Sequence, residues 1–280
     1  MEVRRSSSAG MWLAEAEAFL REREAESSLP LGLAMAARDT AEARAATTGW
    51  TVRDGSGVAG CAFLPTSAVL VLSHATADAI DSLASAAAES ADVSITGAVG
   101  PEHAAERFAA EFARRRGVAW RRHWALILHR LGELVPPPAT AGRTRPATLD
   151  DAATIAEWIV AFHRDTGSLV RPMDPRAQAE RSINSGRLYV HEQRGVPVSL
   201  AGWSRPTGRT CSINLVYTPI ESRRRGYART ITALVARELA ARGTRDILLF
   251  TNEAEPGPNA LYRSLGFAPL ARFLEVVFEP

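Results

Sequence analysis

Val216-Tyr217-Thr218-Pro219-Ile220-Glu221-Ser222-Arg223-Arg224-Arg225-Gly226-Tyr227-Ala228-Arg229 is the stretch that decides the fold. A strand-like run leads into a basic turn containing Gly226, and a helix is predicted over 227–241. Backbone N–H groups at a helix N-terminus have no intrahelical partner, and the helix dipole adds partial positive charge there. The turn therefore suits a phosphate group, which the backbone could approach closely at the glycine. A solvated arginine run before an ordinary helix is the alternative.

Length and composition limit the remaining possibilities. The chain has 280 residues, 46% of them hydrophobic, which favours two packed domains. A formal net charge of +2 gives no reason to expect a nucleic-acid partner. No run approaches the roughly 20 apolar residues of a membrane span, and no signal-peptide pattern opens the chain. We expect a cytoplasmic protein with reduced cysteines, without a membrane partner and without a bound metal.

A proline-rich connector divides the sequence. Residues 136–142 read Pro-Pro-Pro-Ala-Thr-Ala-Gly, which forms neither a helix nor a central strand. The predicted domains are therefore 1–135 and 143–280, with 136–142 as the linker.

Periodicity predicts alternating elements in both halves. In the first half, helices are expected over 12–24, 77–91 and 102–116, and strands over 49–53, 58–64, 68–72, 93–96 and 120–131, the last as one strand or two. In the second half, strands are expected over 144–148, 187–192, 198–204, 210–217, 246–251 and 270–278, and helices over 151–163 (capped by Asp150), 175–184, 227–241 and 259–264. This order predicts a mixed α/β (α+β) class with helices on both faces of a sheet. The first half repeats the later part of it, which suggests an internal duplication.

Two motifs resemble those of the GNAT N-acetyltransferase family. Arg223, Gly226 and Ala228 match its acetyl-CoA-binding pattern Q/R-x-x-G-x-G/A, and 259–267 (Asn-Ala-Leu-Tyr-Arg-Ser-Leu-Gly-Phe) is similar to its later N…Y…G-F element. The resemblance covers 143–278. It also extends to a two-domain group whose first half is a degenerate GNAT-like domain. The implied architecture is a pair of tandem GNAT-like acyl-CoA N-acyltransferase domains, each with a mixed, mostly antiparallel sheet flanked by helices.

The resemblance implies acetyl transfer from acetyl-CoA to a primary amine of a small molecule or peptide, by direct attack. In the family, the strand before the motif holds the pantetheine arm through free backbone groups, and the turn holds the pyrophosphate. The cofactor-binding residues implied here are Val216, Tyr217, Thr218, Arg223, Arg224, Arg225, Gly226, Tyr227, Ala228, Arg229, Asn252, Asn259 and Tyr262.

The resemblance also implies catalytic roles. The Val216 amide is a donor to the developing oxyanion, and Tyr262 is the general acid for the departing thiolate. A tyrosine that only packs between helix and sheet is the alternative. The base stays open because Ser212 occupies the position of the strand glutamate that some members use. The remaining candidates are a water chain, a backbone carbonyl, or one of His163, Asp165, Glu253 and Glu275.

The resemblance also implies an acceptor site near the loop 166–174, because that region usually lines it in this fold. Its candidate residues are His163, Asp165, Arg171, Trp203, Ser212 and Asn214. In the first half, the turn 72–75 (Leu-Ser-His-Ala) has neither the glycine nor the arginine of the motif, so no second acetyl-CoA site is expected. The missing strand carboxylate keeps a second function open, that of a catalytically silent acetyl-CoA sensor or scaffold. The oligomeric state is left open.

Overall fold

The computed structural model describes residues 1–39, 47–168 and 174–279. These residues form two compact units that do not follow the chain order strictly. Unit 1 comprises 1–129, 250–256 and 269–280, and unit 2 comprises 130–249 and 257–268. The last strand of the chain therefore completes the unit that is built mainly from the first half.

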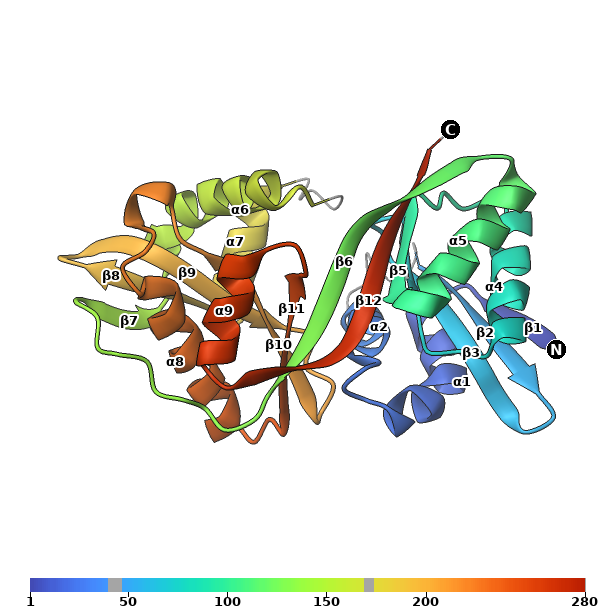
Figure 1. Ribbon diagram of the computed structural model, residues 1–280, viewed down its shortest axis with the longest axis horizontal. Coiled ribbons are helices and arrows are strands. Elements are labelled where there is room, and N and C mark those ends of the chain that lie inside the picture. Colours follow the sequence, from blue (N-terminus) through green and yellow to red (C-terminus); the bar gives the residue numbers. More distant parts are fainter. Residues whose placement is uncertain (40–46, 169–173, 280) are drawn as a thin grey trace. The chain divides into compact units, whose positions relative to one another are not determined.

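Unit 1 is a sheet covered by helices (Figure 1). Its strands lie in the order β1-β2-β3-β4-β5-β12-β6. The β4–β5 pair is parallel, whereas the β1–β2, β2–β3, β3–β4 and β5–β12 pairs are antiparallel. The strands are β1 (Glu2–Ser6), β2 (Thr48–Asp54), β3 (Gly57–Leu64), β4 (Val69–Leu72), β5 (Gly97–Pro101), β6 (Ala119–Leu131) and β12 (Phe267–Glu279). The helices are α1 (Ala9–Glu22), α2 (Ser28–Arg38), α4 (Ala77–Glu89) and α5 (Glu102–Arg116).

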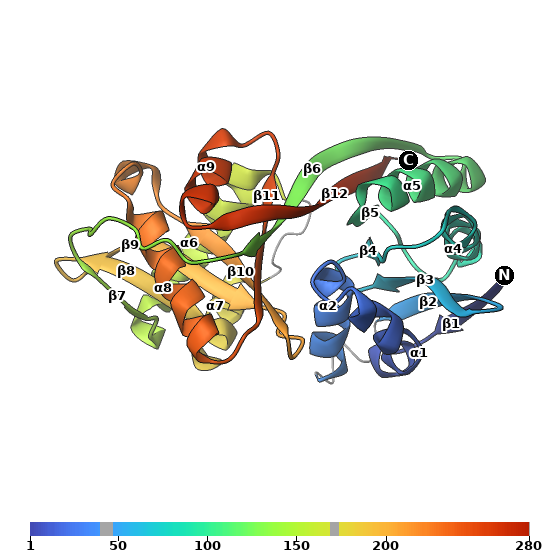
Figure 2. The ribbon, with the colours of Figure 1, turned by 60° about the horizontal axis from the view of Figure 1, so that its bottom comes forward.

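The helices of unit 1 cover opposite faces of its sheet, as the turned view shows (Figure 2). Alternation along β3 explains this arrangement, because successive side chains point to opposite faces. Ala62 packs with the apolar stripes of α4 and α5, whereas Cys61 and Phe63 pack with α1 and α2. Leu274 and Val276 of β12 are fully buried in the α4/α5 cluster.

Unit 2 repeats this plan. Its strands lie in the order β11-β10-β9-β8-β7, with β10 parallel to β11 and the other neighbours antiparallel. They are β7 (Arg143–Pro146), β8 (Leu188–Gln193), β9 (Val196–Ser204), β10 (Thr210–Tyr217) and β11 (Asp246–Asn252). The helices are α6 (Ala152–Thr166), α7 (Pro175–Asn184), α8 (Tyr227–Ala241) and α9 (Pro256–Ser264), with single 3-10 turns η1 (Leu149–Asp151) and η2 (Ile220–Ser222). One core packs α8 and α9 on the sheet, and another packs α6 and α7 on it.

The expected fold class is confirmed: a mixed, mostly antiparallel sheet flanked by helices occurs in both halves. The expected boundary at 136–142 remains a prediction about domains. Unit 2 contains that linker, and unit 1 contains residues 269–280.

Several local predictions were wrong. The short strand lies at Gly97–Pro101 instead of 93–96. Strand propensity misses it because two of its five residues are glycines that close packing requires: a Cβ on Gly97 would lie 2.5 Å from the Val276 carbonyl oxygen. The N-cap residue of α6 is Asp151, not Asp150, and Thr148 caps the preceding turn η1 in a capping box with Asp151. The sequence did not predict α2 or β1, whereas the strand expected over 120–131 is present as the single strand β6.

Among the described residues, no helix combines the length and the hydropathy that a membrane crossing requires.

Candidate functional site

β10 separates from β11 before either strand ends. Within the described residues, the parallel ladder joins only Thr210–Ser212 to Asp246–Leu248, although β10 continues to Tyr217. On its other edge, β10 has a register shift against β9 between Asn214 and Tyr217, and Leu215 has a φ of 51°. Such a bulge bends a strand and leaves backbone groups outside the ladder. Val216, inside this bulge, is half-buried. An extended ligand could therefore pair with β10 here.

The basic turn after β10 leads into α8 without a capping side chain. Arg224 and Gly226 have positive φ values of 62° and 84°. Gly226 is the N-cap residue of α8 and supplies no side-chain hydrogen bond, so the first amides of this 15-residue helix lack a side-chain acceptor. The amides of Tyr227, Ala228 and Arg229 thus form an N-terminus suited to an anion.

The three arginines of the turn differ in their surroundings. Arg223 folds back, donating from Nε to the Thr218 carbonyl at 2.9 Å and from Nη2 to Asp165 at 3.0 Å. Its guanidinium lies 5.9 Å from the centre of the Tyr217 ring. Arg224 and Arg225 are exposed, and neither forms an ion pair with another described residue. These two arginines are the ones available to a ligand phosphate, whereas Arg223 braces the strand end.

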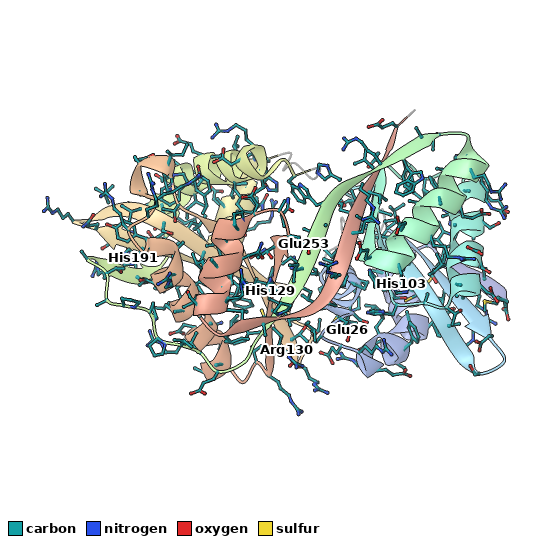
Figure 3. The ribbon with its side chains drawn as sticks, viewed as in Figure 1. Glu26, His103, His129, Arg130, His191 and Glu253 are labelled. Carbon is teal, nitrogen blue, oxygen red and sulfur yellow. The ribbon has the colours of Figure 1, made fainter. Side chains whose placement is uncertain are left out.

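The linker contacts the same turn. The Thr140 and Thr230 hydroxyls lie 3.0 Å apart, and a Cβ on Gly226 would approach Thr140 Cγ2 to 3.0 Å. His191, buried on β8 (Figure 3), has Nε2 3.0 Å from the Ala141 carbonyl and Nδ1 2.8 Å from the Thr144 hydroxyl. Because a carbonyl only accepts, Nε2 carries a hydrogen. Residues 140–144 therefore form a fixed strap beside the start of α8.

Tyr227 connects that strap to the helix. Its ring lies 5.1 Å from the His191 ring, and its hydroxyl donates to Gln193 Oε1 at 2.9 Å. The Tyr227 side chain is thus used in packing, and only its backbone amide remains to bind a ligand. Neither Thr140 nor His191 was singled out by the sequence, since a linker residue and a strand histidine carry no motif.

Asn259 and Tyr262 lie one turn apart on α9 and both are buried. Tyr262 packs edge-on to Phe267, with ring centroids 6.0 Å apart, within the α8/α9 core. Burial raises the pKa of Tyr262, so its hydroxyl stays protonated at neutral pH. The side chain therefore retains the proton that a general acid must supply.

Three other predicted residues lie in the segments grouped with unit 1. Asn252 ends β11, where its side chain accepts from the Ala254 amide at 3.0 Å. Glu253 is exposed and forms an ion pair with Arg272 (Figure 3). Glu275 pairs with Val99 across β12 and β5, and burial raises its pKa to about 7.

A cavity of about 510 Å³ opens in unit 2 between α6, α7 and the strands β8, β9 and β10. Three predicted acceptor residues line it: His163, Trp203 and Asn214. Asn214 donates to the Ser204 hydroxyl at 2.9 Å, and among the described residues the buried Nδ1 of His163 has no hydrogen-bond partner. Burial lowers the pKa of His163, so its imidazole is neutral near pH 7 and able to accept a proton.

The remaining acceptor candidates do not line this cavity. Ser212 is fully buried in β10, and its hydroxyl has no hydrogen-bond partner among the described residues. Asp165 pairs with Arg164 at 2.9 Å and with Arg223, and these bonds lower its pKa. An ionised, doubly paired carboxylate is a weak base. Arg171 lies outside the described residues.

In unit 1, the turn 72–75 corresponds to the basic turn before α8, and side chains of unit 1 fill the space around it. Thr76 caps α4 by accepting from the Ala79 amide at 3.3 Å, and a Cβ on Gly60 would lie only 2.5 Å from Ala75 Cβ. The Ser73 hydroxyl accepts from the Cys61 amide and donates to the His74 carbonyl. These contacts occupy the positions that stay open before α8.

In the described part of the chain, no group of three or more His, Cys, Asp or Glu side chains could hold a metal ion.

Comparison with known proteins agrees with this geometry. Residues 193–274 match the family described as FR47-like protein. No curated protein matches the chain. A GNAT-family acetyltransferase from Colwellia psychrerythraea is similar in structure, with a TM-score of 0.62 at 11% identity and 100% of both chains covered. A Drosophila protein has a TM-score of 0.72 at 14% identity, covering 99% of this chain and 98% of its own.

A tandem GNAT protein from the clavulanic acid biosynthesis pathway has a TM-score of 0.53 at 15% identity, over 100% of this chain and 99% of that one. At such identities the likeness shows the fold, which is the tandem GNAT fold. The FR47-like match spans the basic turn 223–226 and the Asn259–Phe267 element, so the family model and the two sequence motifs lie in the same half of the chain.

Proposed function

From the premise that the chain is a GNAT-type acyltransferase, we propose that its C-terminal half transfers an acetyl group from acetyl-CoA to a primary amine. Three features of unit 2 together carry the proposal: an α8 N-terminus without a side-chain cap, two exposed arginines with no ion pair among the described residues, and a bulged β10 that separates from β11. The first two features suit a pyrophosphate, and the third suits an extended pantetheine arm.

The residues present fit the cofactor. The amides of residues 227–229 would hold the diphosphate, Arg224 and Arg225 would neutralise its charge, and β10 around Val216 would pair with the arm. Bound acetyl-CoA supplies the thioester carbonyl that an amine can attack.

The proposed reaction requires two proton movements. The neutral amine forms the new C–N bond as the C–S bond breaks, and the Val216 amide donates a hydrogen bond to the carbonyl oxygen as it gains charge. Tyr262 gives its proton to the departing thiolate, which leaves as the free thiol of CoA. We assign the proton lost by the attacking nitrogen to His163, because its imidazole is neutral and shares a cavity with Asn214 and Leu215, directly before Val216.

Calorimetry with acetyl-CoA, followed by thiol release with a panel of amines, tests this function. We expect micromolar binding and thiol release that depends on the amine. Replacing both Arg224 and Arg225 with Gln should weaken acetyl-CoA binding and reduce its salt dependence, because exposed charges are screened by salt. Replacing the exposed Arg237 of α8 with Gln is the control and should change neither. A protein that binds acetyl-CoA and never exceeds background thiol release would instead be a silent sensor, and one that does not bind it would exclude both functions.

A further inference from the structure

The cavity beside β10 carries an unbalanced positive charge. Among its twelve lining residues are Arg181 and Arg187, and none is Asp or Glu. Within residues 1–39, 47–168 and 174–279, neither guanidinium has a carboxylate within 4.0 Å. Elsewhere in unit 2 the pattern is different: Arg176, on the same helix as Arg181, pairs with Glu180 at 2.6 Å. Two arginines that line a cavity without counter-ions suit an anionic ligand.

Arg187 is positioned by an aromatic ring. Its guanidinium carbon lies 5.4 Å from the centre of the Trp203 ring, and that of Arg242 lies 5.2 Å from it. A cation held against a ring keeps its planar N–H donors free for a second partner. Since a carboxylate accepts two parallel bonds from a guanidinium, Arg187 is prepared for such a group.

The rest of the lining is apolar or neutral. Phe162, Leu188 and Leu215 supply apolar surface, and serines, Gln178 and Asn214 supply neutral polar groups. Arg181, Ser182 and Ser185 come from the C-terminal end of α7. A helix C-terminus carries partial negative charge and disfavours a multiply charged anion. The cavity therefore favours a single carboxylate over a phosphate.

We propose that the amine acceptor of this site is an amino acid or a closely related amine that bears a carboxylate, bound by Arg181 and Arg187. The inference rests on the proposed acetyl transfer and names its substrate class. The carboxylate lies at the arginine end of the cavity, the apolar side chain lies against Phe162 and Trp203, and the amine is directed toward His163 and the β10 bulge. Acetylation turns the cationic amine into a neutral amide and leaves the carboxylate unchanged.

The test compares matched acceptors at equal concentrations of neutral amine. Each of a set of amino acids with apolar side chains is measured beside its amide and its decarboxylated amine, and O-phosphoethanolamine represents a phosphate-bearing amine. We expect kcat/KM for the carboxylates to exceed that of their neutral counterparts by about ten- to hundred-fold, the range typical of hydrogen bonds to a charged group. Equal rates for acids and amides, or a preference for the phosphate, would overturn the proposal.

Variants assign the effect to the two arginines. Arg187→Gln and Arg181→Gln should each raise KM for the carboxylate acceptor about ten-fold and leave KM for acetyl-CoA unchanged, while Lys at either position should restore part of the loss. Arg176→Gln on the same helix, outside the cavity, is the matched control and should behave as the unmodified protein does. Equal KM values in all three Gln variants would contradict the assignment, and thermal unfolding identifies any variant that fails to fold.

The two proposals fail separately. Loss of acetyl-CoA binding in the unmodified protein would remove the proposed function. Normal acetyl-CoA binding with indiscriminate turnover of neutral amines would remove only the substrate class. If the protein binds CoA but shows no turnover, the substrate class is tested by calorimetry, which compares the binding of amino acids and of their amides in the presence of CoA. Tighter binding of the amino acids would support the proposed carboxylate site.

Discussion

Tyr262 is the residue whose environment bears most directly on chemistry. Its pKa is raised by burial, so the phenol is protonated at neutral pH, as the proposed general acid must be. We predict that Tyr262→Phe lowers kcat about 100-fold, within the range of general acid catalysis, and changes acetyl-CoA affinity little. Tyr189→Phe is the control, because Tyr189 is also a buried tyrosine of this core. Single-turnover kinetics and calorimetry measure the two effects, and equal losses in rate and affinity would assign Tyr262 to packing instead.

Glu275 gives unit 1 a measurable dependence on pH. It lies opposite Val99, which packs with Val69 and Val71, and burial raises its pKa to about 7. The folded chain therefore keeps this proton after the unfolded chain has released it near pH 4.5. Stability is fully present below pH 4.5 and falls as the pH rises toward 7. At pH 8 the loss is on the order of 3 kcal/mol, from 1.36 kcal/mol per pKa unit over the interval from 4.5 to about 7.

Glu275→Gln should therefore raise the melting temperature relative to the unmodified protein at pH 8 and have little effect at pH 4.5. Glu22→Gln, an exposed change in the same unit, should shift neither value. Denaturation curves at the two pH values provide the measurement. A stabilisation independent of pH would indicate better packing instead of removal of a buried charge.

His163 makes the stability of unit 2 depend on pH in the opposite direction. Because burial lowers its pKa, the unfolded chain binds a proton more readily below about pH 6.5, and the folded state loses stability as the pH falls through that region. His163→Gln should remove this acid-side loss. The difference in melting temperature between the two proteins, measured from pH 8 to pH 5, should widen in favour of the variant toward low pH. A constant difference would show that the histidine is not desolvated.

At the scale of elements, residues 140–144 lie against the start of α8, where we propose that the phosphate binds. Gly226 has a φ of 84°, and a Cβ there would lie 3.0 Å from Thr140 Cγ2. We predict that Gly226→Ala weakens acetyl-CoA binding about ten-fold and lowers stability by about 1 kcal/mol, since alanine is strained at positive φ. Adding Thr140→Ser removes the methyl and keeps the hydroxyl. If this second change restores affinity as well as stability, the glycine serves the strap and not the phosphate.

The elements that the sequence predicted best are those with strong periodicity and clear ends. Helices 102–116, 175–184 and 227–241 and strand 210–217 agree with the structure at both ends. The basic turn 223–226 was recognisable as a candidate site for the same reason, because its signal is local. Arg181 and Arg187 were not recognised, since their importance arises from missing counter-ions and a neighbouring ring, which only the folded chain brings together.

At the scale of the whole molecule, the last strand of the chain belongs to the compact unit that is built mainly from the first half. The connector 136–142 is a clear break in sequence, yet residues 269–280 complete unit 1. No local pattern could reveal this, because β12 reads as the closing strand of the half that precedes it. Pairing partners far apart in sequence are fixed by packing: Leu274 and Val276 fill the core between β5 and the helices α4 and α5.

The position of β12 in unit 1 predicts how fragments of the chain behave. A chain of residues 1–135 lacks β12, so β5 would expose an unpaired edge, and the α4/α5 core would lose two fully buried side chains. We predict that 1–135 alone is insoluble or unfolded, whereas 1–135 and 136–280 expressed together co-purify as a soluble complex with cooperative unfolding. Leu274→Ala with Val276→Ala in the second fragment should abolish co-purification, while Glu279→Gln should not. Independent folding of 1–135, detected by circular dichroism and sedimentation, would contradict this prediction and support the expected boundary at 136–142.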